Sequence, residues 1–382
     1  MRITFPTITA RDLTEHPGAR IVDLRSPSEF AEDHVPNAVN VPLFDDVQRA
    51  LVGTLYVQDS PQNAFVAARE IVRAKIGALV SDISAATGWT PDAMDFENRV
   101  DSLTGDGIER MSSFLLAADA DQPPRDPVVF HCWRGGMRSR SVLQFVRELG
   151  LRDATLLEGG YKGYRAEVMR QLARYDAPPL FVLRGLTGVG KTLVLRQIER
   201  LAPESVIDLE GLAGHRSSLL GMVGLEPCTQ KTFESRFAAR MRRPLGPALI
   251  VEGESRKVGD VILPPSFWSA MESATNIELV ASVERRIDVL TTDYLATERG
   301  RIELRAQLPQ VEARMAQAHI GPGLVALLDT GRTDELVRLL LEHYYDPLYR
   351  HGQKGKTFAE RFDATDPVEA AERCIEWCLA QR

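Results

Sequence analysis

Cysteine and long apolar runs are both scarce in this sequence. Its four cysteines, Cys132, Cys228, Cys374 and Cys378, are too few and too irregularly spaced for a disulfide framework or an ordinary zinc site. No apolar run approaches the roughly 18 residues that a membrane helix needs, and the start of the chain lacks a basic, apolar signal segment. We therefore expect a cytoplasmic protein with no membrane partner, in which a thiol can stay free.

Positive charge is also in short supply. The chain has 46 lysines and arginines against 53 aspartates and glutamates, a net charge of −7, so its composition does not favour nucleic acid over the whole surface. The acidic excess lies within the first 130 residues, and the rest of the chain can therefore carry local basic faces. With 382 residues, 44% of them hydrophobic, the chain is long enough for two domains with a core each.

Two consecutive prolines, Pro178 and Pro179, divide the chain because they cannot continue the helical stretch before them. On both sides short apolar runs alternate with helical segments, which is typical of parallel α/β sheets. We expect strands at 19–24, 127–130, 180–183, 205–208, 248–252 and 276–281. The predicted fold is a first α/β domain over residues 1–176, with a mainly helical insertion at about 44–122, and a second α/β domain over 180–382.

A cysteine opens a loop that is rich in glycine and arginine. Cys132 follows the strand at 127–130 directly, and the loop is expected to enter a helix near Arg140. Backbone N–H groups of such a loop, with the helix N-terminus, form a positive cradle for a thiolate or for an anionic sulfur or selenium adduct. Cys132 is thus the catalytic candidate. The expected anion-binding residues are Trp133, Arg134, Gly135, Gly136, Met137, Arg138 and Ser139.

This loop alone permits three interpretations. The first is a reactive cysteine that carries sulfur or selenium. The second is a cysteine-dependent phosphatase, which has the same spacing between its cysteine and arginine as Cys132 and Arg138. The third is a buried structural cysteine. Two distant stretches, 21–42 and 157–164, resemble the opening strand-and-turn motif and the end of a rhodanese domain. This resemblance implies that the first domain is rhodanese-like and that Cys132 stands where the rhodanese nucleophile would stand.

A complete phosphate-binding loop, with the pattern G-x-x-x-x-G-K-T, spans residues 185–192. The strand at 180–183 precedes it and an amphipathic stretch follows, which is the context of a P-loop NTPase-like domain. Its glycines let backbone amides face phosphates, and its threonine can bind Mg²⁺. The pattern does not distinguish a nucleotide from another diphosphate. The expected diphosphate-binding residues are Gly185, Thr187, Gly188, Val189, Gly190, Lys191 and Thr192.

The two loops together resemble the tRNA 2-selenouridine synthase family. The resemblance covers almost the whole chain, including residues 52–56, 159–162, 208–216, 230–234, 251–256 and 344–349. The chain departs from the family at Ser217 to Gly221, where Gly-Ser-x-Phe-Gly is usual, and at Gly253, where an acid is common. Both departures concern the pocket expected beside the phosphate loop.

The resemblance implies a two-step change at the wobble uridine of certain tRNAs. The family transfers a geranyl group from geranyl diphosphate to the sulfur of 2-thiouridine, and then replaces the geranylated sulfur with selenium from selenophosphate. It implies a thiolated tRNA as partner and an enzyme that supplies selenophosphate. By this resemblance the phosphate loop would hold the diphosphate leaving group, and Cys132 would take or position the selenium.

Several polar side chains are expected to line the pocket beside the phosphate loop. Asp208 and Glu252 end two predicted strands and should approach a metal ion or its waters. His215 and Arg216 follow one of these strands, and the remaining members lie in stretches that resemble the family. The expected pocket residues are Asp208, Glu210, His215, Arg216, Glu252, Glu254 and Arg256.

Two basic clusters could contact tRNA phosphates, although solvated helix faces would give the same pattern. They are Lys162, Arg165, Arg170 and Arg174 before the prolines, and Arg236, Arg240, Arg242 and Arg243 after them. Three tyrosines near the C-terminus could stack on bases or on a prenyl tail, or pack into the core. These are Tyr344, Tyr345 and Tyr349.

Three function classes therefore remain open. A tRNA-modifying transferase predicts binding of thiolated tRNA and a prenyl diphosphate. A rhodanese-type sulfurtransferase with a nucleotide-binding domain predicts thiosulfate turnover and ATP binding. A cysteine-dependent phosphatase fused to a kinase-like domain predicts hydrolysis of aryl phosphates.

Overall fold

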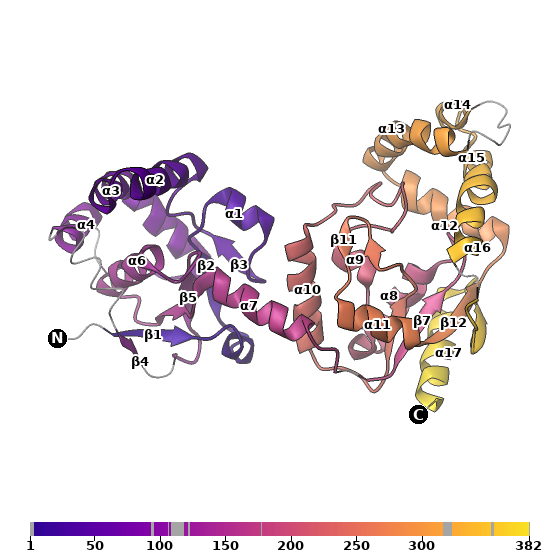
Figure 1. Ribbon diagram of the computed structural model, residues 1–382, viewed down its shortest axis with the longest axis horizontal. Helices are drawn as coiled ribbons and strands as arrows, with labels where there is room; N and C mark the ends of the chain where they lie inside the picture. Colours follow the sequence, from indigo (N-terminus) through magenta and orange to yellow (C-terminus); the bar gives the residue numbers. More distant parts are fainter. Residues whose placement is uncertain are drawn as a thin grey trace. The chain divides into compact units, whose positions relative to one another are not determined.

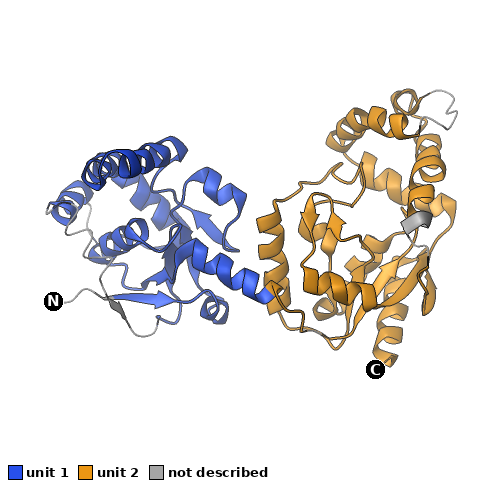
Figure 2. Cartoon of the chain, in the orientation of Figure 1, with its two compact units in different colours: residues 1–171 blue, residues 172–382 orange. Residues whose placement is uncertain are grey.

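The chain folds into two compact units in a computed structural model (Figure 2). The first unit comprises residues 1–171 and the second residues 172–382. The structure describes residues 4–92, 95–105, 107, 118–120, 123–176, 178–315, 323–352 and 355–381.

The first unit is built on a parallel sheet of six strands in the order β3-β2-β5-β6-β1-β4 (Figure 1). The strands are β1 (Thr4–Ile8), β2 (Arg20–Asp23), β3 (Ala38–Asn40), β4 (Ala118–Ala120), β5 (Val128–His131) and β6 (Ala154–Leu157). The helices are η1 (Asp12–Glu15), α1 (Pro27–Glu32), α2 (Asp46–Gln58), α3 (Pro61–Thr87), α4 (Phe96–Thr104), α6 (Met137–Glu148) and α7 (Gly160–Leu172).

The central strands bring the Cys132 loop to the carboxyl edge of this sheet. All four residues of β5 are buried, as expected for a parallel strand covered on both faces. In the register between β2 and β5, Asp23 lies opposite His131. The segments that leave the two strands, with Arg25 on one and Cys132 on the other, therefore begin at the same edge.

Helices α2, α3 and α4 occupy most of the stretch predicted as a helical insertion. Asp45 caps α2 with a capping box to Gln48, and Ser60 caps α3, which explains the break between the two helices. Helix α3 buries an apolar face in the core of the unit, whereas none of the residues of α2 is buried among the described residues. Parts of the predicted insertion, namely 93–94, 106, 108–117 and 121–122, lie outside the described residues.

The second unit has a parallel sheet of five strands in the order β13-β12-β7-β9-β8, with a separate antiparallel pair β10-β11. The strands are β7 (Leu180–Arg184), β8 (Val206–Ile207), β9 (Leu249–Glu252), β10 (Lys257–Val258), β11 (Val261–Ile262), β12 (Thr275–Val280) and β13 (Glu360–Asp363). The helices are α8 (Lys191–Leu201), η2 (Pro203–Ser205), α9 (Leu209–Ala213), α10 (Gln230–Arg242), α11 (Pro265–Ser273), α12 (Val283–Leu295), α13 (Glu298–Arg314), α14 (Leu324–Asp329), α15 (Thr333–Leu340), the π-helix η3 (Leu341–Tyr345), α16 (Asp346–Gly352) and α17 (Pro367–Ala380).

Two apolar clusters stabilise the second unit. One joins the sheet to α8 and α17 and contains Phe181, Val194 and Cys374. The other is helical, between α12, α13, α14, α15 and η3, and contains Tyr344 and Tyr345. These two tyrosines pack into this cluster and also line the cavity at the phosphate loop. Cys374 and Cys378 are buried on α17, and their burial raises the pKa of Cys374 to about 12.

The predicted α/β fold class is confirmed, with parallel sheets in both units. Two local expectations were wrong. Helix α6 begins at Met137 and not near Arg140, because the glycines directly before it already complete the turn. Strand β8 covers only Val206–Ile207, because Pro203 starts a 3₁₀ turn before it and Asp208 caps α9 after it.

Candidate functional site

The Cys132 loop forms a tight turn between β5 and α6. The Cys132 thiol is free, is only 3% exposed, and lies 3.3 Å from the Ser139 hydroxyl oxygen. Gly135 has a φ of 64° and Gly136 is the N-cap of α6, so the loop reaches the helix N-terminus without side chains in the way. The thiol thus lies where the N–H groups of the first helical turn can stabilise negative charge.

The N-terminus of α7 holds this loop in shape. The backbone N–H groups of Tyr161 and Lys162 donate to the carbonyl oxygens of Cys132 and Trp133, each over 2.9 Å. Gly160 lies so close that an added Cβ would collide with the carbonyl oxygen of Cys132 and the nitrogen of Gly135. Gly160, the first residue of α7, therefore serves the loop as well as the helix.

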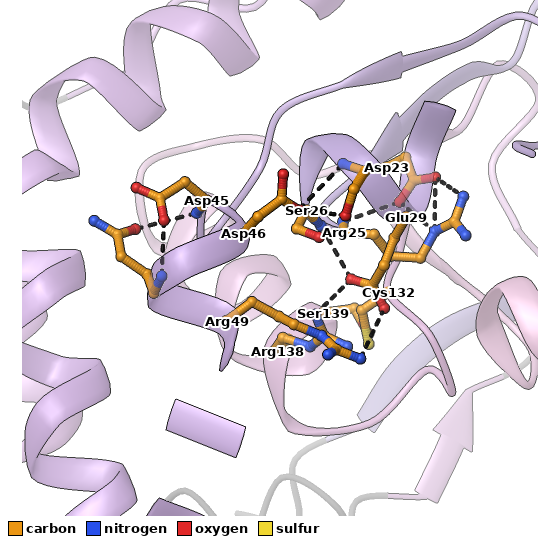
Figure 3. Close-up of polar contacts among 12 residues, drawn as sticks. Asp23, Arg25, Ser26, Glu29, Asp45, Asp46, Arg49, Cys132, Arg138 and Ser139 are labelled. Atoms are coloured by element: carbon orange, nitrogen blue, oxygen red, sulfur yellow. Dashed lines mark hydrogen bonds and ion pairs between the residues drawn. The ribbon is translucent and has the colours of Figure 1, made fainter. Parts of the chain in front are cut away.

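A carboxylate lies between two arginines next to the loop. Figure 3 shows Glu29 of α1 beside Arg138 of α6 and Arg49 of α2. Each arginine has a guanidinium nitrogen 3.6 Å from a carboxylate oxygen of Glu29. Glu29 also accepts a hydrogen bond from the backbone N–H of Ser26. Arg138 is thus partly neutralised, whereas Arg134 of the same loop is exposed.

A buried polar network behind the loop was not anticipated from the sequence. The fully buried Arg25 pairs with Asp23 over 2.6 Å, and its guanidinium lies 3.8 Å from the centre of the Tyr161 ring. The Tyr161 hydroxyl donates to Asp33 over 2.8 Å. Burial, followed by the charge of Asp33, raises the pKa of Tyr161. The ring of Tyr161 stacks obliquely on Trp133, so the network connects β2 to the loop.

The phosphate loop has the backbone conformation that its pattern predicts. It follows β7 and enters α8, with positive φ at Gly185, Gly188 and Gly190. An added Cβ at Gly185 would collide with the carbonyl oxygen of Leu279, and one at Gly188 would lie 2.8 Å from the carbonyl oxygen of Arg286. Gly185 and Gly188 are therefore required by both conformation and packing, and Gly190, with a φ of 95°, by conformation alone.

Lys191 lies buried at the centre of the phosphate loop. Its ammonium donates to the carbonyl oxygen of Gly185 over 3.2 Å and lies 5.3 Å from the centre of the Tyr349 ring. Burial opposes the charge, but Tyr349 and the carboxylates of Glu254, Glu210 and Glu252 raise the pKa of Lys191 above its ordinary value. The lysine is therefore charged and held for an anion.

Carboxylates gather in front of this lysine. Thr192 donates to Glu210 over 3.2 Å, and the backbone N–H of Glu210 donates to Glu252 over 2.6 Å. Burial and the neighbouring charge of Glu254 raise the pKa of Glu210 to about 8. Glu252 is 1% exposed, its second carboxylate oxygen has no partner among the described atoms, and burial raises its pKa too. Asp208 caps α9 through the N–H of Gly211.

A cavity of about 770 Å³ opens at the phosphate loop. It brings together Lys191, Thr192, Asp208, Glu210, Arg216 and Glu254, while His215, Glu252 and Arg256 do not line it. Arg216 also donates to the carbonyl oxygen of Val223. Apolar and aromatic side chains complete the wall, among them Leu193, Trp268 and Leu348.

Tyr349 is the member of this pocket whose role the sequence did not specify. Its hydroxyl accepts from the backbone N–H of Gly185 over 3.2 Å, at the start of the phosphate loop. In the described residues no group of three or more His, Cys, Asp or Glu side chains has the arrangement of a metal site. The oxygen atoms of Thr192, Glu210 and Glu252 are nevertheless of the kind that Mg²⁺ prefers.

The basic residues proposed to contact tRNA differ in their exposure and in the groups that they already contact. Lys162, Arg174 and Arg243 are exposed. Arg240 donates to three backbone carbonyl groups, those of Pro203, Glu204 and Val206, and so stabilises the turn before β8. The others lie near partners: Arg165 near Asp33, Arg170 at Glu167, and Arg236 at the Leu212 carbonyl oxygen. Arg242 is partly buried on α10.

Comparison with known proteins matches both units. Residues 178–327 match the family described as the tRNA 2-selenouridine synthase AAA domain, and residues 8–70 and 96–167 match the rhodanese-like domain. The rhodanese-like match is interrupted between residues 70 and 96, in the second part of α3 and the segment that follows it. No helix of the described residues is long and apolar enough to cross a membrane.

Curated relatives cover most of the chain. The chain is 31% identical over 357 residues to the tRNA 2-selenouridine synthase of Chromohalobacter salexigens, with 87% of each protein covered. It is 30% identical over 300 residues to that of Nitrosomonas europaea, covering 77% of this chain and 68% of the relative. The corresponding protein of Cronobacter sakazakii is 29% identical over 368 residues, with 87% of each covered.

Proposed function

The chain belongs to the tRNA 2-selenouridine synthase family, and on that premise we propose that it carries out both steps of the conversion of 2-thiouridine to 2-selenouridine at the wobble position of tRNA. The observation that carries the proposal is the occurrence of two separate anion sites in one chain, a free thiol at a helix N-terminus and a phosphate loop. The first would serve selenium transfer and the second geranyl transfer.

In the first step the sulfur of 2-thiouridine attacks the allylic carbon of geranyl diphosphate. The carbon–oxygen bond breaks, diphosphate leaves, and the uridine loses its N3 proton. Lys191 and the amides of the phosphate loop would bind the departing diphosphate, where negative charge grows in the transition state. The apolar and aromatic wall formed by Leu193, Trp268 and Leu348 suits a prenyl donor.

A magnesium ion fits the phosphate-loop pocket. Thr192 and Glu210 have oxygen atoms 3.2 Å apart, and Glu252 has a buried carboxylate oxygen without a partner in the described part of the chain. Thr192 and Glu210 would hold the ion directly or through its waters, whereas Glu252, which does not line the cavity, accepts a hydrogen bond from the backbone N–H of Glu210. When bound, Mg²⁺ would supply further positive charge for the diphosphate.

In the second step selenium replaces the geranylated sulfur. The selenium of selenophosphate adds to C2 of the base, the C2–S bond breaks, and geranylthiol leaves after taking up a proton. Water then removes the phosphoryl group as phosphate. Cys132 would position the selenium of selenophosphate beside C2, while Arg134, Arg138 and the loop amides would bind the selenophosphate anion.

The test is an incubation of the purified protein with 2-thiouridine tRNA and geranyl diphosphate, followed by selenophosphate, with nucleosides identified by mass spectrometry. The wild type should give the geranyl adduct first and selenouridine second. Lys191→Ala should reduce adduct formation at least about 100-fold, and Cys132→Ser should let the adduct accumulate without selenium. Matched controls are Lys257→Ala, at an exposed lysine, and Cys228→Ser, at another free cysteine. Loss of geranylation in Cys132→Ser, or its survival in Lys191→Ala, would overturn the assignment.

A further inference from the structure

A second cavity lies within the first unit, beside the Cys132 loop. Its volume is about 1070 Å³ and its walls come from α2, α3, α4 and the start of α6. Figure 1 shows these helices together on one side of the unit. A rhodanese substrate such as thiosulfate and the selenophosphate donor are both small anions, so neither needs a space of this size.

The inner wall of this cavity is apolar. The buried side chains of Ala64, Ile76, Leu79, Val100 and Leu103 line it. Arg69 of α3 also lines the cavity, but its charge is paired with Asp101 over 2.9 Å, so this part of the cavity suits a hydrocarbon chain.

The polar side of the cavity is the Cys132 loop. Arg134, Gly136, Met137 and Arg138 all line it, as does Arg49, which lies with Arg138 beside Cys132 in Figure 3. The cavity therefore has cationic and amide groups at the loop and mostly apolar walls away from it, where Arg69 is paired with Asp101. This arrangement fits an amphiphile whose polar group lies at the Cys132 loop and whose apolar chain extends between the helices.

Helix α2 carries apolar surface that the described structure leaves uncovered. Tyr56 is 59% exposed and Val57 82% exposed, and both line the cavity. A helix gains its stability mainly from burying an apolar face. An apolar ligand in the cavity would supply that burial.

We propose that this cavity binds the geranyl chain of the S-geranylated wobble uridine, so that its C2 lies at the Cys132 loop. The inference rests on the proposed function, because the prenyl chain is attached to the very sulfur that selenium replaces. A site that breaks the C2–S bond must accommodate the chain beside the reacting carbon. The geranylthiol that leaves would then remain in an apolar space, away from the incoming selenium.

The test measures binding without turnover. Full-length protein is titrated, without selenophosphate, with anticodon stem-loop RNAs carrying S-methyl, S-dimethylallyl, S-geranyl or S-farnesyl 2-thiouridine. The wild type should bind the S-geranyl RNA about tenfold or more tightly than the S-methyl RNA. Equal dissociation constants for these two RNAs would overturn the proposal.

Two variants change the cavity in opposite directions. Ala68 and Phe65 both line it from α3 and are half-buried. Ala68→Phe should abolish the preference for geranyl over methyl while leaving S-methyl RNA binding unchanged, and Phe65→Ala should extend the preference to the farnesyl chain. Ala74→Phe is the matched control, because Ala74 is exposed on the same helix and does not line the cavity. If both cavity variants kept the wild-type order of affinities for the four RNAs, the geranyl chain would bind elsewhere and the proposal would be wrong.

The binding assay separates this inference from the proposed function. It uses RNA that already carries the alkyl group, so it reports on the cavity even if the protein makes no geranyl adduct from geranyl diphosphate. If the protein formed no geranyl adduct but still bound RNAs according to the length of the alkyl chain, the proposed geranylation step would be wrong and the cavity assignment would stand. If the protein formed the adduct but its RNA affinity did not depend on the length of the alkyl chain, the geranylation step would stand and the cavity assignment would be wrong.

Discussion

Glu29 limits the positive charge that the Cys132 loop can offer to an anion. Its carboxylate lies 3.6 Å from both Arg138 and Arg49, and it caps α1 through the N–H of Ser26. Glu29→Gln should keep the cap, since glutamine also serves in a capping box, while releasing both arginines. We expect the KM for selenophosphate to fall about two- to fivefold, in line with the energies of partly exposed ion pairs.

This effect is measured as the initial rate of selenouridine formation on pre-geranylated RNA at varied selenophosphate. Glu15→Gln, an exposed acid in η1, is the control for a general change in net charge. A KM that rises in Glu29→Gln, or falls equally in Glu15→Gln, would show that the carboxylate does not compete with the donor.

His131 should make the first unit sensitive to acid. It is fully buried, no hydrogen bond to either ring nitrogen is formed within the described residues, and its Nε2 lies 3.7 Å from an Asp23 carboxylate oxygen. Burial lowers the pKa of His131, although Asp23 opposes this. The unfolded chain therefore takes up a proton below about pH 6.5, where the folded protein does not. Stability should fall as the pH drops through this range, by up to about 1.4 kcal/mol per pH unit.

His131→Asn removes this titration. Urea unfolding at a series of pH values should show the variant about 1–2 kcal/mol less stable at pH 8, with the difference shrinking as the pH falls from 6.5. His343→Asn, at an exposed histidine, should follow the wild type throughout. A constant difference between His131→Asn and wild type would contradict the prediction.

The sequence identified individual side chains where a pattern is local. Cys132 and Lys191 each stand within one short loop whose spacing carries the chemistry. It did not identify the contact between Tyr161 and Asp33, or that between Tyr349 and Gly185, which join residues 128 and 164 positions apart. Such pairs depend on the register of strands and helices, which no local spacing records.

The N-terminus of α7 and the Cys132 loop are packed directly against each other. Gly160 has a φ of 59°, and a Cβ there would collide with backbone atoms of Cys132 and Gly135. Gly160→Ala should therefore displace the loop and reduce selenium transfer about 100-fold, the cost of a displacement of about 1 Å in a catalytic group. Geranylation, assigned to the other unit, should be unchanged.

The two rates are measured separately by mass spectrometry, with pre-geranylated RNA for the selenium step. Gly77→Ala is the control, because Gly77 lies on α3 with nothing within 4 Å of an added Cβ. Selenium transfer within a few-fold of wild type in Gly160→Ala would mean that the loop tolerates the displacement.

Helices and strands differ in how well the sequence foretold them. The parallel strands β5, β7 and β9 are buried along their whole length, and continuous apolar runs announce such strands. The sequence predicted helical structure at α2 but not its lack of buried residues. A helix beside a cavity has the same apolar content as a helix beside a core, so the sequence does not distinguish the two. The cavity itself results from the packing of four helices, which pairwise patterns do not determine.

Each unit has its own sheet and its own apolar cluster, so substitutions in one should leave the other folded. The Cys132 loop belongs to the first unit and the phosphate loop to the second. This division allows the two proposed steps to be disabled independently. It also raises the question of whether one molecule must perform both.

If the geranylated tRNA can leave the protein, two disabled variants should complement each other. Neither Cys132→Ser nor Lys191→Ala alone should make selenouridine from thiolated tRNA. An equimolar mixture should, because Cys132→Ser supplies the geranyl adduct and Lys191→Ala replaces its sulfur. The rate should lie below that of the wild type, since the RNA must dissociate and bind again. The measurement is selenouridine by mass spectrometry over time, with the double variant Cys132→Ser/Lys191→Ala as control. No product from the mixture, when Lys191→Ala converts pre-geranylated tRNA normally, would show that the intermediate does not leave the molecule that made it.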